Sequence, residues 1–189
     1  MDIQVVILAA GYSSRANTNK LLLELNSKTV IENCINSFYD ICSNIIVVGG
    51  FRIDELKPVL KHYNKVNLVF NPFYDSGMFS SVKQGLMHAN AEKIFITPGD
   101  FPLIKQETLY KMLLIKADIV IPSYNGKYGH PVLLSDRYTC EIMSGKYLNL
   151  RDFIQNNPNT VIDTDDIGVL YDIDTMDDYE YVKNKVLLK

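Results

Sequence analysis

A chain of 189 residues, 47% of them hydrophobic, can bury a sizeable core, and its length predicts a single domain over residues 1–189. The formal net charge of −3 argues against a nucleic-acid-binding surface, which needs a basic stripe. No apolar run reaches the ~18 residues of a membrane span, and the first residues lack the layout of a signal peptide, so we expect a cytoplasmic protein without a nucleic-acid or membrane partner.

Along the chain, short apolar runs rich in β-branched residues alternate with amphipathic segments. Expected strands cover residues 5–9, 45–48, 67–70, 94–97 and 119–121, and a further strand-like run covers residues 169–171. Expected helices cover residues 30–39, 53–63, 80–89 and 107–115. Thr29 and Glu32 have capping-box spacing at the start of the first helix. The alternation predicts an α/β protein with right-handed crossovers and an open, mostly parallel sheet that carries helices on both faces.

The first strand runs into a loop with the composition of a polyphosphate cradle. Gly11, Ser13 and Ser14 allow backbone N–H groups to approach phosphate oxygens, while Arg15 and Lys20 offer positive charge. Gly11 stands alone, which excludes the Walker A pattern and the dinucleotide fingerprint with its three spaced glycines. The alternative is an ordinary turn at the end of the first strand.

Three later strand ends are expected to meet this loop, because ligands of open α/β sheets bind at the carboxyl ends of the strands. The first carries Asn71 and residues 75–81, the second carries Asp100, and the third carries Asp174. All of them are therefore expected in one crevice.

Asp100 and Asp174 are candidate ligands of Mg²⁺, because this ion takes one or two protein carboxylates together with phosphate oxygens. One alternative is that Asp100 only caps its own turn. Another is that Asp174 is a hydrogen-bond acceptor beside a helix. Thr175 and Asp178 offer a capping box there, and Asp172, Asp177 and Asp178 would be ordinary first-turn acids.

Five motifs stand in a fixed order between residues 5 and 179: LAAGYSSR followed by Lys20, NPFYDSGMFSSVKQGL, TPGDFP, GHPVLL and YDIDTMDDY. The set resembles the molybdenum cofactor cytidylyltransferases within the wider group of molybdopterin-nucleotide transferases. The resemblance implies a Rossmann-like three-layer α/β/α nucleotidyltransferase fold with a mostly parallel sheet, and Mg²⁺ as cofactor. It also implies a nucleoside triphosphate and a phosphorylated pterin as substrates, and makes a molybdoenzyme a candidate partner. The GMFSS stretch resembles the cytidylyl type, which favours CTP.

The same resemblance implies roles position by position. The nucleotide-binding residues would be Leu8, Ala9, Ala10, Gly11, Ser13, Ser14, Arg15, Lys20, Asn71, Gly77, Met78, Ser80, Ser81, Pro98, Gly99 and Asp100. Arg15, Lys20 and Asp100 would be catalytic, and Asp100 and Asp174 would hold the metal. His130 and Arg151 would bind the acceptor, the alternative for His130 being a structural hydrogen bond.

Two positions depart from the family pattern, because Asn17 and Asn149 stand where the family has glycine. Asparagine enters the left-handed backbone region more readily than other non-glycine residues, so we expect both loops to keep their shape.

Three other functions stay open at the level of sequence. One is guanylyl or other nucleotidyl transfer to a different phosphorylated acceptor, such as a sugar phosphate. A second is a nicotinamide oxidoreductase, which the missing glycines after Gly11 disfavour. The third is a non-catalytic protein of molybdoenzyme maturation.

Overall fold

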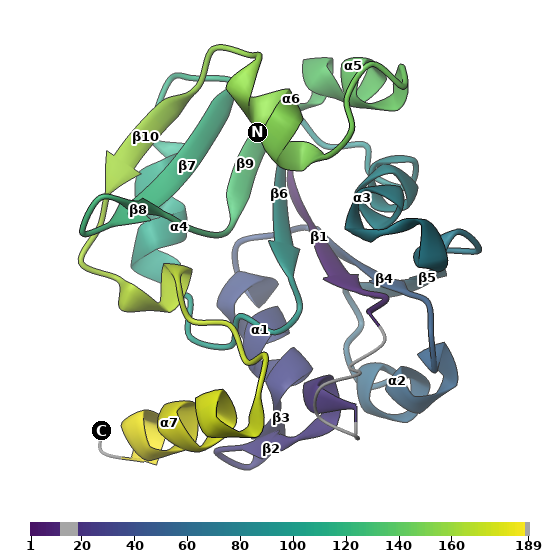
Figure 1. Cartoon of the computed structure of the whole chain (residues 1–189), viewed down its shortest axis with the longest axis vertical. Coiled ribbons are helices and arrows are strands. Elements are labelled where there is room, and N and C mark those ends of the chain that lie inside the picture. The colour runs from purple at the N-terminus through teal and green to yellow at the C-terminus, as the bar shows by residue number, and fades with distance from the viewer. Residues whose placement is uncertain (12–18, 188–189) are drawn as a thin grey trace.

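A computed structural model describes residues 1–11 and 19–187, and among these the side chains up to residue 184. Its centre is an eight-stranded sheet in which seven strands follow the order β10-β7-β9-β6-β1-β4-β5 and β8 pairs with β7 (Figure 1). The strands are β1 (Ile3–Ala9), β4 (Asn44–Gly49), β5 (Val66–Phe70), β6 (Lys93–Pro98), β7 (Ile119–Tyr124), β8 (Lys127–Tyr128), β9 (Val132–Ser135) and β10 (Thr160–Asp163). A separate small hairpin pairs β2 (Glu24–Leu25) with β3 (Lys28–Thr29).

Helices cover both faces of the sheet. They are α1 (Val30–Tyr39), α2 (Ile53–Leu60), α3 (Met78–Leu86), α4 (Gln106–Leu113), α5 (Thr139–Met143), α6 (Leu150–Gln155) and α7 (Met176–Leu187). Short 3-10 turns are η1 (Lys20–Leu22), η2 (Tyr74–Ser76), η3 (Asp136–Tyr138) and η4 (Ile167–Val169).

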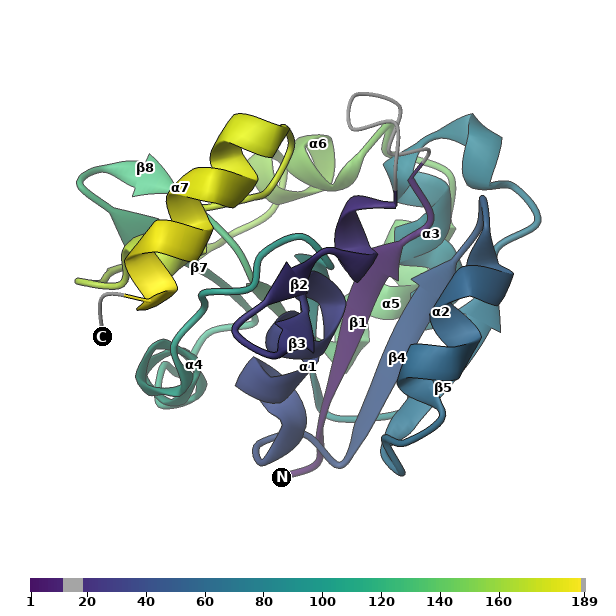
Figure 2. The same cartoon turned by 90° about the horizontal axis from the view of Figure 1, so that it is seen from below.

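Successive side chains of β1 point alternately into two hydrophobic cores. Val5 and Ile7 point into a core shared with α1, α2, α4 and α7, whereas Val6 and Leu8 point into a core shared with α3, α5 and α6. Figure 2 shows β1 and β4 side by side, and β4 lies between β1 and the edge strand β5. The expected three-layer α/β fold with a mostly parallel sheet is therefore confirmed.

The first helix illustrates how local sequence sets an element. The backbone N–H of Thr29 donates to the Glu32 carboxylate at 2.7 Å, and the N–H of Glu32 reaches Thr29 Oγ1 at 3.4 Å. This capping box starts α1 at Val30, and the helix ends at Tyr39, as predicted. Elsewhere the predicted helices differ from the observed ones at their ends: α2 stops at Leu60, and α3 begins at Met78.

One predicted element is wrong. Residues 169–171 do not form a strand; residues 167–169 form η4 instead, which Asp166 caps through the N–H of Gly168 at 2.9 Å. A Cβ on Gly168 would lie 2.1 Å from the carbonyl oxygen of Leu103, so the chain packs here as a tight turn. The strands β2, β3, β8, β9 and β10 and the helices α5 and α6 were not predicted from the sequence. Among the described residues, no helix has the length and apolar character needed to cross a membrane.

Candidate functional site

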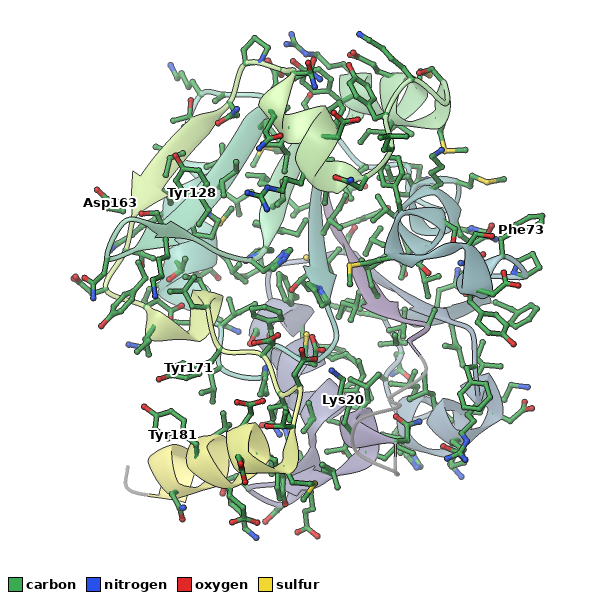
Figure 3. The ribbon with its side chains drawn as sticks, viewed as in Figure 1. Lys20, Phe73, Tyr128, Asp163, Tyr171 and Tyr181 are labelled. Carbon is green, nitrogen blue, oxygen red and sulfur yellow. The ribbon has the colours of Figure 1, made fainter. Side chains whose placement is uncertain are left out.

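Three segments far apart in sequence meet below the carboxyl end of β6. Lys20 opens η1, Asp100 follows β6, and Asp174 precedes α7. Lys20 Nζ donates to Asp100 Oδ2 and to Asp174 Oδ1, each at 2.7 Å. Figure 3 shows Lys20 at this junction, beside the segment that leads into α7. The structure thus brings together three of the predicted site residues.

Backbone contacts fix the position of Asp100. The N–H of Gly99 donates to the carbonyl of Leu8 at 2.9 Å, and the N–H of Ile173 donates to the carbonyl of Asp100 at 3.0 Å. A Cβ on Gly99 would lie 2.7 Å from Ile31 Cδ1, so this turn packs closely on α1. The loop after β6 is therefore tied to β1 on one side and to the segment before α7 on the other.

The carboxylate of Asp100 has one engaged and one open oxygen. Oδ2 accepts from Lys20, whereas Oδ1 is buried and receives no hydrogen bond from any residue that the structure describes. No described N–H group uses Asp100 as the cap of its own turn. A buried oxygen without a donor carries a desolvation cost, so this atom has full capacity for a ligand.

Negative charge exceeds positive charge among the described groups at this junction. Burial lowers the pKa of Lys20, but Asp100 and Asp174 outweigh that effect and the net pKa is raised. Burial and the charge of Asp100 raise the pKa of Asp172. Asp172 lies outside α7, which starts at Met176, so the interpretation as a first-turn acid is wrong for Asp172, whereas it is confirmed for Asp177 and Asp178. Asp172 and Asp174 are two positions apart, and in an extended segment this spacing places both side chains on the same side, which was a signal that both face the site.

The start of α7 is capped separately. The N–H of Thr175 donates to Asp178 Oδ2 at 2.8 Å, and the N–H of Asp178 donates to Thr175 Oγ1 at 3.1 Å. The predicted capping box is thus confirmed. Asp174 is directed to Lys20 and does not supply this cap.

A divalent cation fits the chemistry of these carboxylates. Carboxylate oxygens are the ligands that Mg²⁺ and Mn²⁺ prefer, and Asp100 Oδ1 is an open donor atom of that kind. The described residues hold no cluster of three or more His, Cys, Asp or Glu side chains with metal-binding geometry. A metal at Asp100 and Asp174 would therefore need further oxygens from a ligand or from water.

The segment after β5 forms a loop that is held by its own side chains. Asn71, only 1% exposed, donates from Nδ2 to Ser80 Oγ at 2.8 Å and to Ser81 Oγ at 3.0 Å. Its Oδ1 accepts from the N–H of Phe73 at 2.9 Å, and Ser80 Oγ donates to the carbonyl of Gly77 at 2.8 Å. These three polar side chains shape the loop before any ligand binds. Their predicted contacts with base and ribose stay a prediction.

Gly77 has the one conformation in this loop that requires glycine. Its φ of 96° lies in the left-handed half of backbone space, and no atom lies within 4 Å of the position of a Cβ. Met78 follows as the first residue of α3 and is 63% exposed. The backbone between them is therefore accessible to a ligand.

A cavity of about 820 Å³ lies between the sheet and helices α3 and α6. Its apolar lining consists of Leu8, Met78, Phe79, Val82, Ile96, Ile121, Val132, Leu150 and Ile154. Its polar lining includes Lys127, His130, Asn149, Arg151, Gln155 and Asn159. The cavity therefore joins two predicted nucleotide-site residues, Leu8 and Met78, to both predicted acceptor residues, His130 and Arg151.

His130 forms part of the cavity wall in its neutral form. Its backbone N–H donates to the carbonyl of Val169 at 2.8 Å, and the ring of Phe101 meets its imidazole edge to face at 5.0 Å. Burial lowers the pKa of His130 to about 4, although a hydrogen bond with the backbone of Ile96 opposes the shift. Nδ1 is buried and has no hydrogen-bond partner among the described residues.

Asn149 does not replace glycine in the way the sequence analysis predicts. Its φ of −160° is extended backbone that any residue adopts, so the left-handed expectation is wrong at this position. The side chain instead caps α6, because its oxygen accepts from the N–H of Asp152 at 2.8 Å. Arg151 stands in the first turn of the helix that this cap begins.

Four of the predicted residues, Ser13, Ser14, Arg15 and Asn17, lie outside the described residues. Gly11 is the last described residue before them. It is exposed, and no atom lies within 4 Å of the position of a Cβ.

Sequence reasoning missed Asp166, a carboxylate that is 2% exposed. It accepts from Lys105 N at 2.8 Å, Thr108 Oγ1 at 2.9 Å and Gly168 N at 2.9 Å. Asp166 therefore ties the start of α4 to the segment that carries Asp174. The bonds from Lys105 and Thr108 span 61 and 58 positions of sequence, so no local pattern predicts them.

The chain matches the family model described as the MobA-like NTP transferase domain over residues 5–160. The molybdenum cofactor cytidylyltransferase of Escherichia coli (strain K12) is 29% identical over 185 residues, which are 97% of this chain and 96% of that protein. A nucleotidyl transferase structure from Methanothermobacter thermautotroptrophicus has a TM-score of 0.86 and 22% identity, covering 99% of this chain and 98% of the other. A protein from Mycobacterium tuberculosis H37Rv, solved in complex with manganese, has a TM-score of 0.78 and 22% identity over 97% of this chain and 99% of its own.

Proposed function

This chain belongs to the MobA-like NTP transferase domain family, and from that premise we propose that it transfers CMP from CTP to a phosphorylated molybdopterin and releases pyrophosphate. The similarity to the molybdenum cofactor cytidylyltransferase of Escherichia coli over nearly the whole of both chains supports this choice of base and acceptor.

One observation carries the proposal: the 820 Å³ cavity shares Leu8 and Met78 with the predicted nucleotide site. A cavity with a largely apolar floor suits a flat heteroaromatic ring better than a sugar, whose hydroxyl groups need polar partners. Arg151 and Lys127 at the same cavity offer positive charge for an acceptor phosphate. The cavity thus has the chemistry of an acceptor site next to a nucleotide.

In the proposed reaction a phosphate oxygen of the acceptor attacks the α-phosphorus of the triphosphate. The bond from the α-phosphorus to the bridging oxygen breaks, and pyrophosphate leaves with that electron pair. The attacking phosphate is already ionised near neutral pH, so the site needs no strong general base. Catalysis then depends on positioning the two substrates and on stabilising charge.

Individual residues have separate tasks in this scheme. Lys20, together with Arg15, neutralises the triphosphate and the departing pyrophosphate. Asp100 and Asp174 hold the divalent cation, which when bound offsets negative charge on the phosphates. The open Oδ1 of Asp100 supports this assignment, as does the manganese complex of the mycobacterial protein with the same fold. His130, in its neutral form, and the charged Arg151 orient the acceptor in the cavity.

The proposal is tested by thermal protection with each of the four ribonucleoside triphosphates in the presence of Mg²⁺. A ligand at a hundred times its dissociation constant adds about 2.7 kcal/mol to the stability. We expect protection by CTP, followed by formation of a pterin cytosine dinucleotide and pyrophosphate when phosphorylated molybdopterin is added. Protection by GTP alone would assign guanylyl transfer, and the absence of any protection would favour a non-catalytic maturation protein.

A further inference from the structure

Lys20 lies between the two carboxylates that are expected to hold a metal. Its ammonium contacts both Asp100 and Asp174 at 2.7 Å. The side chains of Lys20 and Asp100 are only 16% and 15% exposed, so water screens this ion pair far less than a surface pair. In this arrangement one ammonium forms an ion pair with each of the two acids.

A divalent cation held by the same two carboxylates would lie close to the ammonium, because Lys20 Nζ is 2.7 Å from each of them. Like charges at such a separation disfavour each other strongly in a partly buried site. The lysine and the metal therefore compete for Asp100 and Asp174. The buried Oδ1 of Asp100, which has no donor among the described residues, shows that the ammonium does not use the whole carboxylate.

We propose that Lys20 takes the place of the metal when no substrate is bound, and that it moves to the triphosphate when the metal enters. This inference rests on the proposed function, because a triphosphate is the anion that draws the lysine away. Metal and triphosphate then bind cooperatively, since each binds better to the state in which Lys20 has left the carboxylates. The coupling is reciprocal, so the metal strengthens triphosphate binding by the same factor.

The test measures binding of Mn²⁺ alone, in the absence of nucleotide, by the electron paramagnetic resonance signal of the free ion. We compare the wild type with Lys20→Gln and with Lys28→Gln, an exposed lysine whose substitution makes the same change in net charge. The apparent affinity of a site is reduced by the fraction of molecules that are competent to bind. Lys20→Gln is expected to bind Mn²⁺ at least about tenfold more tightly than the wild type, if the competent state is a minor population of roughly 0.1 to 10%.

Two controls make the result decisive. Lys28→Gln is expected to bind Mn²⁺ as the wild type does. The double variant Lys20→Gln with Asp100→Asn is expected to lose the gain. An unchanged affinity in Lys20→Gln, an equal gain in Lys28→Gln, or a gain that survives Asp100→Asn would each overturn the proposal. Circular dichroism of each variant establishes that it is folded before binding is compared.

A separate measurement distinguishes this inference from the proposed function. The affinity of the wild type for a non-hydrolysable methylene analogue of CTP is measured with and without Mn²⁺. A wild-type protein that does not bind this analogue overturns the proposed transfer of CMP. The Mn²⁺ affinity of Lys20→Gln then still decides for or against the lysine as a substitute for the metal.

Discussion

At the scale of single residues, Asp100 is the side chain on which the proposed chemistry depends most. Asp100→Asn keeps the size of the side chain and removes its charge, so the fold is expected to survive while metal-dependent transfer falls by roughly a thousandfold, the equivalent of several kcal/mol of lost charge stabilisation. The measurement is the initial rate of pyrophosphate release. Asp54→Asn, on the exposed surface of α2, is the matched control and is expected to keep the wild-type rate. Near-normal turnover in Asp100→Asn would leave Asp100 as a structural residue.

His130 gives the protein a predictable response to acid. The unfolded chain takes up a proton at this residue near its usual pKa of 6.5, whereas the folded protein resists until the pH approaches about 4. Between these values the unfolded state binds more protons, so the free energy of unfolding falls as the pH falls. We expect the free energy of unfolding of His130→Gln to fall by about 2 kcal/mol less than that of the wild type when the pH is lowered from 7 to 4.5. Urea denaturation at both pH values measures this difference, and equal losses in the two proteins would contradict it.

At the scale of elements, the sequence predicts what local signals determine. The capping box of Thr29 and Glu32 sets the start of α1, and continuous apolar runs mark β1, β4 and β6, which are buried from both faces. The apolar run of β9 covers only Val132, Leu133 and Leu134, and the place of this short strand in the sheet depends on its antiparallel pairing with β6 and β7. Non-local pairing was therefore the part of the fold that the sequence could not supply.

The same limit applies to the candidate site. The motifs pointed to Lys20, Asp100 and Asp174 as separate features, and the structure shows that one ammonium joins both acids across 80 and 154 positions of sequence. The prediction for the backbone of Asn149 was wrong for a local reason. The family's glycine suggested a special backbone conformation, whereas the observed residue is an N-cap in extended conformation.

Asp166 is expected to control the position of the segment that carries Asp174. Both carboxylate oxygens of Asp166 accept hydrogen bonds, and Asp166→Asn replaces one of them by an amide group that donates. We therefore expect the free energy of unfolding to fall by roughly 1 to 3 kcal/mol. Because Ile173 bonds to Asp100, loosening this segment is also expected to weaken the contact between Lys20 and Asp174. Chemical denaturation measures the first effect. Asp165→Asn, on the exposed neighbouring residue, is the control and is expected to change stability by less than about 0.5 kcal/mol.

At the scale of the whole molecule, different segments are expected to bind the two substrates. The turn after β1 and the loop after β5 lie at the proposed nucleotide site, whereas residues near β8, β9 and α6 line the far part of the cavity. The rings of Phe101 and His130 are in contact, which links the loop of Asp100 directly to the cavity wall. An open α/β sheet with two substrates at one edge can therefore change its acceptor without altering its phosphate chemistry.

This division of the molecule predicts that acceptor binding and nucleotide binding are lost separately. Arg151→Ala removes a charged partner of the acceptor phosphate, worth roughly 1.5 to 3 kcal/mol, so KM for the acceptor is expected to rise at least about tenfold. The Kd for CTP, measured by calorimetry with Mg²⁺, is expected to stay unchanged. Arg137→Ala also removes one arginine, at a position outside the cavity lining. It is expected to leave KM for the acceptor and Kd for CTP at their wild-type values. A fall in CTP affinity that matches the loss of transfer in Arg151→Ala would place the nucleotide in this cavity, and an unchanged KM would place the acceptor elsewhere.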